Sequence, residues 1–255
     1  MNHLFKILLR TSIAWAVLTG VIQTSFAQTD PLGPLSNLTE FTVKEGHDVQ
    51  FREGIKTWMA CYLPQNGNWT WSIWHRQQGE GSVYVLASYY VNWAEYDKED
   101  PAGKDCQNLA ISLINPHIEK ATTHVARFLP AISKTTNDGS QLIVVTFFEL
   151  NQANGYKFLP VVTALNQAQA KIEGSPRGYW YTWLTRGPES PNYHVATPYK
   201  DYAAMDVMRE NIWTMYENEV GKAKRDEMQA DYRSAVNKVY VYHYKLIPEI
   251  SRPTR

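Results

Sequence analysis

The chain has 255 residues, 25 basic and 25 acidic side chains, and a formal net charge of zero. A near-neutral chain without basic runs argues against nucleic acid and anionic membrane surfaces as its main partners. The length allows one large domain or two of about 110 residues, which is enough for a substantial hydrophobic core.

Residues 1–27 have the layout of a secretory signal peptide. An apolar stretch follows Lys6 and Arg10, and Ser25-Phe26-Ala27 forms a small-x-small cleavage site. The apolar stretch is too short for a stable membrane span. We therefore expect cleavage near Ala27, a periplasmic or secreted mature protein, and no membrane span after cleavage. A retained anchor is the alternative.

The chain contains one stretch twice, at residues 69–97 and 178–206. A fixed offset without gaps aligns both copies, and self-similarity of this kind indicates two copies of one module. The matched pairs include Trp71 with Trp180, Trp74 with Trp183, Tyr84 with Tyr193, Tyr90 with Tyr199, and Asp97 with Asp206.

The first copy is expected to span residues 38–134, after an exposed lead-in at residues 28–37. Apolar residues at helical spacing (Phe51, Ile55, Trp58 and Tyr62) predict its first helix. The expected order is a strand at 38–43, a helix at 47–62, a hairpin at 70–77 and 82–90, a helix at 105–123, and a strand at 125–133.

The second copy is expected to span residues 141–248, after a cluster of turn residues at 135–140. Its expected order is the same, although its second helix is longer and highly charged. The elements are a strand at 142–150, a helix at 156–172, a hairpin at 179–185 and 193–196, a helix at 207–236, and a strand at 238–246.

Each copy thus reads strand, helix, strand, strand, helix, strand, which is the ferredoxin-like unit of an α+β protein. Such a unit has a four-stranded antiparallel sheet with both helices on one face. The other face would carry Trp, Tyr and Ile, too much apolar surface to leave in water. We expect the two sheets to cover each other face to face as an eight-stranded barrel, which can be filled or hold one small ligand.

The two cysteines, Cys61 and Cys106, could be separate buried thiols or a disulfide. In a ferredoxin-like unit the first helix ends at the same end of the sheet where the second begins. Cys61 closes the first helix and Cys106 opens the second. We therefore expect a disulfide, which an oxidising compartment would permit.

The tandem order resembles the dimeric α+β barrel superfamily, most closely its NIPSNAP-like members. The resemblance covers nearly the whole mature chain. It rests on the early strand, Gly46, the amphipathic helix and two aromatic-Ala-x-x-Asp blocks at residues 93–97 and 202–206. It implies a pseudo-dimer within one chain. The superfamily includes cofactor-free monooxygenases, isomerases, haem enzymes and proteins of unknown role, and no catalytic motif of one member can be placed on this sequence.

Strand alternation predicts which residues could line a ligand pocket. Thr70, Ser72, Trp74 and Arg76 share one face of the first hairpin, and the matching positions of the second copy carry Tyr179, Tyr181 and Trp183. We expect Trp74, Arg76, Tyr179, Tyr181 and Trp183 to line the barrel. In the alternative, Trp74 and Trp183 fill the interior by stacking.

Other polar residues have simpler interpretations. His117 and His124 are expected on one face of the helix at 105–123, outside the barrel, and Asp97 and Asp206 as acids at helix starts. His75, Arg76, Arg186 and His194 are interpreted as surface or hairpin-end residues rather than as catalysts. No metal ligand set is present, so neither a metal nor a cofactor is expected. Haem binding is kept as a third option, and catalytic residues stay unassigned.

The sequence therefore predicts an exported barrel that binds a small aromatic or apolar molecule. Whether it is also a cofactor-independent enzyme, monooxygenase-like or isomerase-like, is left open. The alternative is a non-enzymatic module with a filled barrel, in which the aromatic surface or the helix at 207–236 binds a protein partner. A cavity of roughly 300 Å³ or more with convergent polar groups would distinguish the two.

Overall fold

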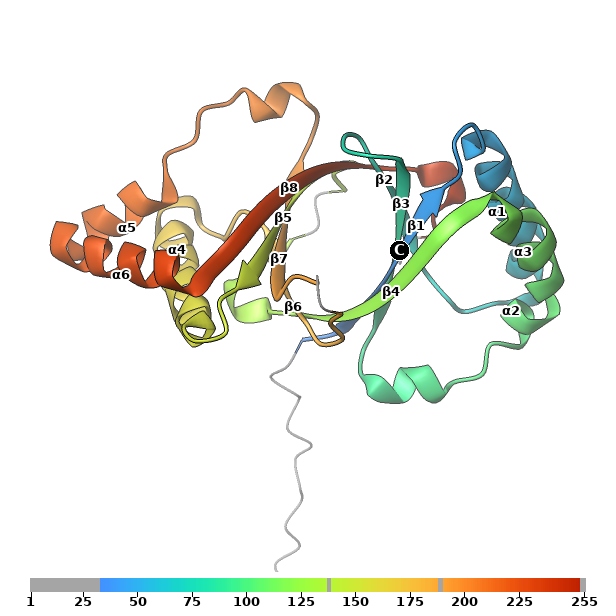
Figure 1. The fold of residues 1–255 in the computed structure, drawn as a ribbon, viewed down its shortest axis with the longest axis horizontal. Helices are drawn as coiled ribbons and strands as arrows, with labels where there is room; N and C mark the ends of the chain where they lie inside the picture. The colour runs from blue at the N-terminus through green and yellow to red at the C-terminus, as the bar shows by residue number, and fades with distance from the viewer. Residues whose placement is uncertain (1–32, 137–138, 188–189, 253–255) are drawn as a thin grey trace, which may run out of the picture. The chain divides into compact units, whose positions relative to one another are not determined.

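The computed structural model describes residues 33–136, 139–187 and 190–252. The predicted signal peptide and the first half of the predicted lead-in lie outside these residues. The first half of the described region is shown in blue to green in Figure 1. Its elements are β1 (Leu35–Val43), α1 (Asp48–Tyr62), β2 (Ser72–Arg76), β3 (Ser82–Tyr90), α2 (Pro101–Asp105), α3 (Gln107–Leu113) and β4 (Ile118–Phe128).

The second half runs through the same kinds of element. They are β5 (Leu142–Leu150), α4 (Phe158–Glu173), β6 (Tyr179–Trp183), β7 (Tyr193–Tyr199), α5 (Ile212–Val220), α6 (Lys222–Ala235) and β8 (Val236–Leu246). Short 3-10 turns, η2 (Trp93–Asp97) and η6 (Ala203–Met205), follow β3 and β7. No helix in the described ranges combines the length and the apolar character that crossing a membrane requires.

The described strands form one closed barrel in the order β1-β3-β2-β8-β5-β7-β6-β4, so the predicted eight-stranded α+β barrel is confirmed. Two short seams join the halves: β2 pairs with β8, starting from Trp74 opposite Leu246, and β4 pairs with β6, starting from Ala126 opposite Trp183. The sheets therefore meet at hydrogen-bonded edges as well as across their faces. Closure leaves no free strand edge.

The helices lie outside the barrel (Figure 1). Phe51 of α1 packs on Tyr84 of β3 with ring centroids 4.9 Å apart, and Phe158 of α4 packs on Phe148 of β5 at 5.0 Å. Each contact belongs to a buried cluster between helices and the outward face of the strands. Because strand side chains alternate, the residues between these outward positions point into the barrel.

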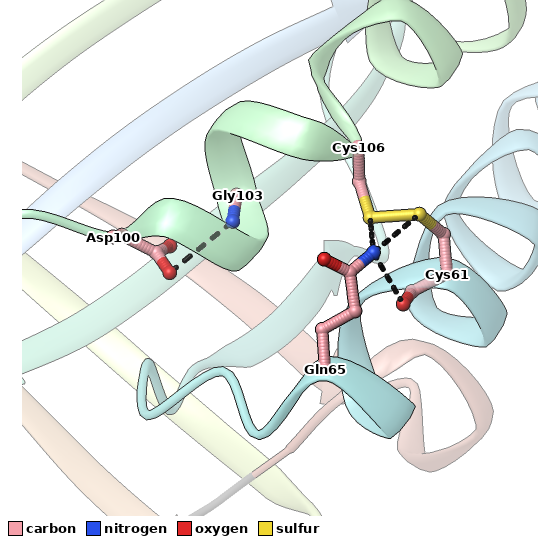
Figure 2. Close-up of a disulfide and its surroundings, with 5 residues drawn as sticks. All are labelled: Cys61, Gln65, Asp100, Gly103 and Cys106. Atoms are coloured by element: carbon pink, nitrogen blue, oxygen red, sulfur yellow. Dashed lines mark hydrogen bonds between the residues drawn. A yellow bond between two sulfur atoms is a disulfide. The ribbon is translucent and has the colours of Figure 1, made fainter.

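The predicted disulfide between Cys61 and Cys106 is present, with Cα atoms 6.0 Å apart. It joins the last turn of α1 to the junction of α2 and α3. Figure 2 shows the Gln65 amide beside both sulfur atoms, with Nε2 3.4 Å from Cys61 Sγ and 3.3 Å from Cys106 Sγ. Asp100 caps α2 by accepting a hydrogen bond from the Gly103 N–H at 3.2 Å.

Gly54 allows α1 and α3 to approach closely, because a Cβ atom there would lie 2.1 Å from the Leu113 carbonyl oxygen. We expect Gly54→Ala to lower the free energy of unfolding by about 1–3 kcal/mol, since the clash outweighs the roughly 1 kcal/mol better helix propensity of alanine. Urea denaturation would measure it. Glu53→Ala, at an exposed position of the same helix, is the control and should change stability little. A stabilised Gly54→Ala variant would contradict the close contact.

The predicted helix at 105–123 is wrong in extent. α3 ends at Leu113, and β4 begins at Ile118 after a 3-10 turn that contains Pro116. β4 satisfies its backbone by pairing with β1 along its length, where Thr122 and Thr123 lie opposite Glu40 and Thr39. Pairing with β1 and the β-branched residues favour a strand here more strongly than the apolar spacing favours a helix.

The predicted helix at 207–236 is also wrong in extent. α5 begins at Ile212, and Gly221, with φ 83° and ψ 162°, separates it from α6. Only glycine reaches this backbone conformation without strain. The lead-in differs too, since β1 begins at Leu35 and the side chains of Leu35 and Ser36 are buried rather than exposed.

Candidate functional site

A cavity of about 800 Å³ occupies the barrel interior. All eight strands of the barrel contribute to its wall, with alternate residues pointing inward. Its volume lies within the range of small-molecule sites and well above the roughly 300 Å³ that separates a ligand cavity from a filled barrel. The interior of this barrel is therefore hollow.

Ten Trp, Tyr and Phe side chains line the wall. They are Trp71, Trp74, Tyr89, Phe147, Tyr179, Tyr181, Trp183, Tyr240, Tyr242 and Tyr244. Burial raises the pKa of Tyr181, Tyr240 and Tyr244, and the Glu40 carboxylate adds to the effect on the last two. These phenols therefore stay protonated at neutral pH. The cavity offers flat apolar surface together with hydroxyl groups that can donate hydrogen bonds.

The buried side chain of His194, on β7, has a protonation state that its hydrogen bond and its burial define. Its Nδ1 accepts a hydrogen bond from Trp183 Nε1 at 2.8 Å, and its ring stacks on Tyr181 at 4.6 Å. An indole N–H can only donate, so Nδ1 carries no proton. Burial lowers the pKa of His194 from 6.5 to about 3, so the ring is neutral and its proton sits on Nε2.

The Nε2–H of His194 has no acceptor among the described residues, and His194 lines the cavity. This N–H is therefore available to a molecule inside the barrel. His124 of β4 also lines the cavity, with its ring centroid 4.7 Å from that of Trp183. Two histidines thus contact Trp183.

Glu40 and Lys120 place charge in the cavity wall. They come from the paired strands β1 and β4, where Glu40 lies opposite Thr122 and Lys120 lies opposite Thr42. Within the described ranges neither side chain has an ion-pair partner. In the second half, by contrast, Lys238 and Glu149 pair at 3.3 Å. Glu40 is thus a carboxylate open to the cavity.

Four of the five residues predicted for the pocket line the cavity: Trp74, Tyr179, Tyr181 and Trp183. Arg76 is not part of the wall. Its guanidinium lies 4.6 Å from the Tyr242 ring centroid, and its Nη2 donates to the Glu80 carbonyl oxygen, which places it beside a wall residue. Tyr179 turns its hydroxyl to the Thr136 carbonyl oxygen at 2.6 Å.

Sequence reasoning missed both cavity histidines. His124 was expected on a helix outside the barrel, but it belongs to β4, and His194 was expected at the surface, but it is buried. The alternation of residues 238–246 did contain a signal for the tyrosines of β8, because Tyr240, Tyr242 and Tyr244 share one face. His75 lies on the outer face, stacked on Tyr84 at 4.4 Å.

The other acids do not belong to this site. Asp97 ends the η2 turn and Asp206 follows η6, so they close short helical turns rather than begin helices, and both are exposed. Among the described residues, no group of three or more His, Cys, Asp or Glu side chains could hold a metal ion.

The sequence matches no model of a known protein family and no curated protein. Solved structures do match. A protein provisionally assigned as a monooxygenase from Lactobacillus acidophilus NCFM has a TM-score of 0.52 and 13% identity, covering 87% of this chain and 96% of its own. A similarly assigned protein from Fusobacterium nucleatum subsp. nucleatum gives 0.51 and 11%, with coverage of 84% and 92%.

An anthrone oxidase-like protein also has a TM-score of 0.51, with 14% identity and the same coverage of 84% and 92%. Such low identities show a shared fold and nothing finer. These three solved structures therefore share the fold of this chain, while membership of the dimeric α+β barrel superfamily stays a prediction. The closer likeness to NIPSNAP-like members stays a prediction.

Proposed function

We propose that this protein is an exported barrel that binds a small aromatic or otherwise apolar molecule inside its cavity. The observation that carries the proposal is the hollow, aromatic-lined interior of about 800 Å³. Apolar walls with a few convergent polar groups are typical of ligand sites. The alternative, a non-enzymatic module, assumes a filled barrel, and a cavity of about 800 Å³ does not support that assumption.

We further propose that the cavity can support cofactor-independent proton transfer, the step with which a monooxygenase-like or isomerase-like reaction would begin. The Glu40 carboxylate is a candidate proton acceptor in the wall. The Nε2–H of His194 is a candidate donor to an oxygen atom of the ligand on which negative charge develops. The fold of the neighbours is compatible with this chemistry but does not assign it.

The export and repeat predictions also belong to this proposal. The disulfide supports an oxidising compartment. Strand order supports two tandem ferredoxin-like units, because β4-β1-β3-β2 in the first half corresponds to β8-β5-β7-β6 in the second. Sequencing the N-terminus of the protein from its native source tests the export prediction. A mature chain that still begins at Met1 would contradict it.

Untargeted mass spectrometry of molecules that co-purify with the native protein tests the binding proposal directly. We expect a small aromatic or apolar compound that is released on denaturation. Added to the emptied protein, this compound should quench tryptophan fluorescence, since Trp74 and Trp183 border the cavity. The absorbance spectrum of the same preparation would also reveal bound haem.

Filling the cavity should abolish binding. Ala196 of β7 faces the interior, so Ala196→Trp would occupy ligand space, and we expect affinity for a cavity ligand to fall by about 100-fold or more, or roughly 2.7 kcal/mol. The matched control is Val241→Trp, which adds the same side chain at an exposed position on β8. Titration with N-phenyl-1-naphthylamine, a neutral fluorescent probe of apolar sites, measures both variants. Equal binding to both would place the ligand elsewhere.

A further inference from the structure

A second pocket, of about 690 Å³, lies beside the start of β5 and the end of β7. Ser140 and Pro198 line both this pocket and the barrel cavity, so the two spaces adjoin. Pro198 lies opposite Ile143 at the pairing of β5 with β7, and Ile143 also faces the cavity. A molecule longer than the barrel cavity could therefore reach this pocket.

The two spaces differ in charge. Four basic residues line the second pocket, namely Lys134, Arg177, Lys200 and Arg209, against one acid, Glu173. Glu173 is already engaged by Arg177, whose Nε donates to Oε2 at 2.9 Å and whose Nη2 donates to Oε1. Lys200 and Arg209 have no acidic partner among the described residues. This part of the surface has an excess of positive charge.

The acids nearest in sequence do not neutralise Lys200 and Arg209. Asp201 accepts a hydrogen bond from the Ala204 N–H at 2.8 Å, and Glu210 Oε1 contacts the side-chain amide of Asn218 at 3.5 Å. The Glu210 carbonyl oxygen accepts from Arg177 Nη2 at 3.1 Å, which helps to hold that guanidinium in place. The Arg209 guanidinium lies over the Tyr199 ring, 5.3 Å from its centroid.

Held guanidinium groups are suited to anions, because their N–H groups match the oxygen geometry of carboxylate, sulfate and phosphate groups. We propose that the ligand of this barrel is amphipathic, with an apolar or aromatic body in the cavity and an anionic group bound by Lys200 and Arg209. This inference rests on the proposed function, since it specifies the chemical class of the same ligand.

Two related fluorescent probes test the inference. N-phenyl-1-naphthylamine is neutral, and 8-anilino-1-naphthalenesulfonate adds a sulfonate to the same skeleton. We expect the sulfonate to bind about ten-fold more tightly or better, a difference of roughly 1.4 kcal/mol. We also expect its affinity alone to fall as salt rises, because screening weakens exposed charge interactions.

Variants separate the two spaces. The double variant Lys200→Gln/Arg209→Gln should lose the ten-fold preference for the sulfonate and keep its affinity for the neutral probe. Lys222→Gln/Lys224→Gln, at two exposed lysines on α6 that line neither space, removes the same number of charges and is the matched control. Ala196→Trp should weaken both probes, which shows that the aromatic body of each sits in the barrel rather than on the surface.

The outcomes distinguish failure of this inference from failure of the proposed function. Equal affinities for the two probes, or a sulfonate preference that survives in the double variant, would overturn the anionic subsite and leave the barrel proposal standing. If neither probe binds, or if Ala196→Trp weakens neither, the barrel proposal fails, and the inference fails with it.

Discussion

Acidification should destabilise this protein on the order of 4 kcal/mol through a single side chain, His194. Burial lowers its pKa from 6.5 to about 3. Above pH 6.5 the ring is neutral in both the folded and the unfolded chain, and the full stability is present. As the pH falls from 6.5 towards 3, His194 becomes protonated in the unfolded chain but stays neutral in the folded chain. The free energy of unfolding therefore decreases by up to about 1.4 kcal/mol per pH unit.

His194→Asn should remove most of this contribution, because Asn keeps an acceptor for Trp183 and does not titrate. Urea denaturation between pH 7 and pH 4 measures the slope of the unfolding free energy for each variant. Tyr181→Phe is the control, since it retains the ring that stacks on His194 and should keep the wild-type slope. Identical slopes in the wild type and His194→Asn would mean that His194 is charged or solvated in the folded protein.

Removing the disulfide should lower the free energy of unfolding by about 3–4 kcal/mol. Cys61 and Cys106 are separated by 45 residues, and a bridge across a loop of this length restricts the unfolded chain by an amount of that order. Cys106 is fully buried in the cluster that holds Phe51 and Trp71. The thiols left by reduction would remain packed there, so the loss should come mainly from the unfolded state.

Chemical denaturation with and without reductant measures this effect, and a thiol titration verifies the state of both cysteines. The double variant Cys61→Ala/Cys106→Ala should match the reduced protein to within the small cost of removing two sulfur atoms. Reductant should leave the double variant unchanged. A wild-type protein with equal stability in both conditions would show that the bridge contributes nothing in solution.

Local patterns predicted much of the fold. The spacing of Phe51, Ile55, Trp58 and Tyr62 identified α1, and alternation with turn residues identified both hairpins. The repeated order of elements then limited the ways in which the apolar faces could be covered. The barrel followed from that limit, because an exposed aromatic sheet face would be unstable in water. The disulfide followed from the positions of Cys61 and Cys106 at helix ends that meet at one end of the sheet.

Local patterns failed where distant strands decide the conformation. Residues 114–123 have apolar spacing compatible with a helix, yet residues 118–123 pair with β1 and form the start of β4. Because a helix was predicted here, His124 was expected outside the barrel, although it lies in the wall of the cavity. The residues next to His194 in the sequence do not indicate that its side chain is buried, because Tyr193 and Val195 face the helices on the other side of the sheet.

The amino-acid sequence by itself thus determined the elements with a strong period and the pairing of Cys61 with Cys106. These depend on residues near one another in the chain or on the order of the elements. Only the tertiary structure decided that the interior is hollow, that His194 is neutral with its proton on Nε2, and that a basic pocket adjoins the cavity. Each of these depends on how side chains from distant strands share one volume, and a cavity is a property of that volume which no single segment encodes.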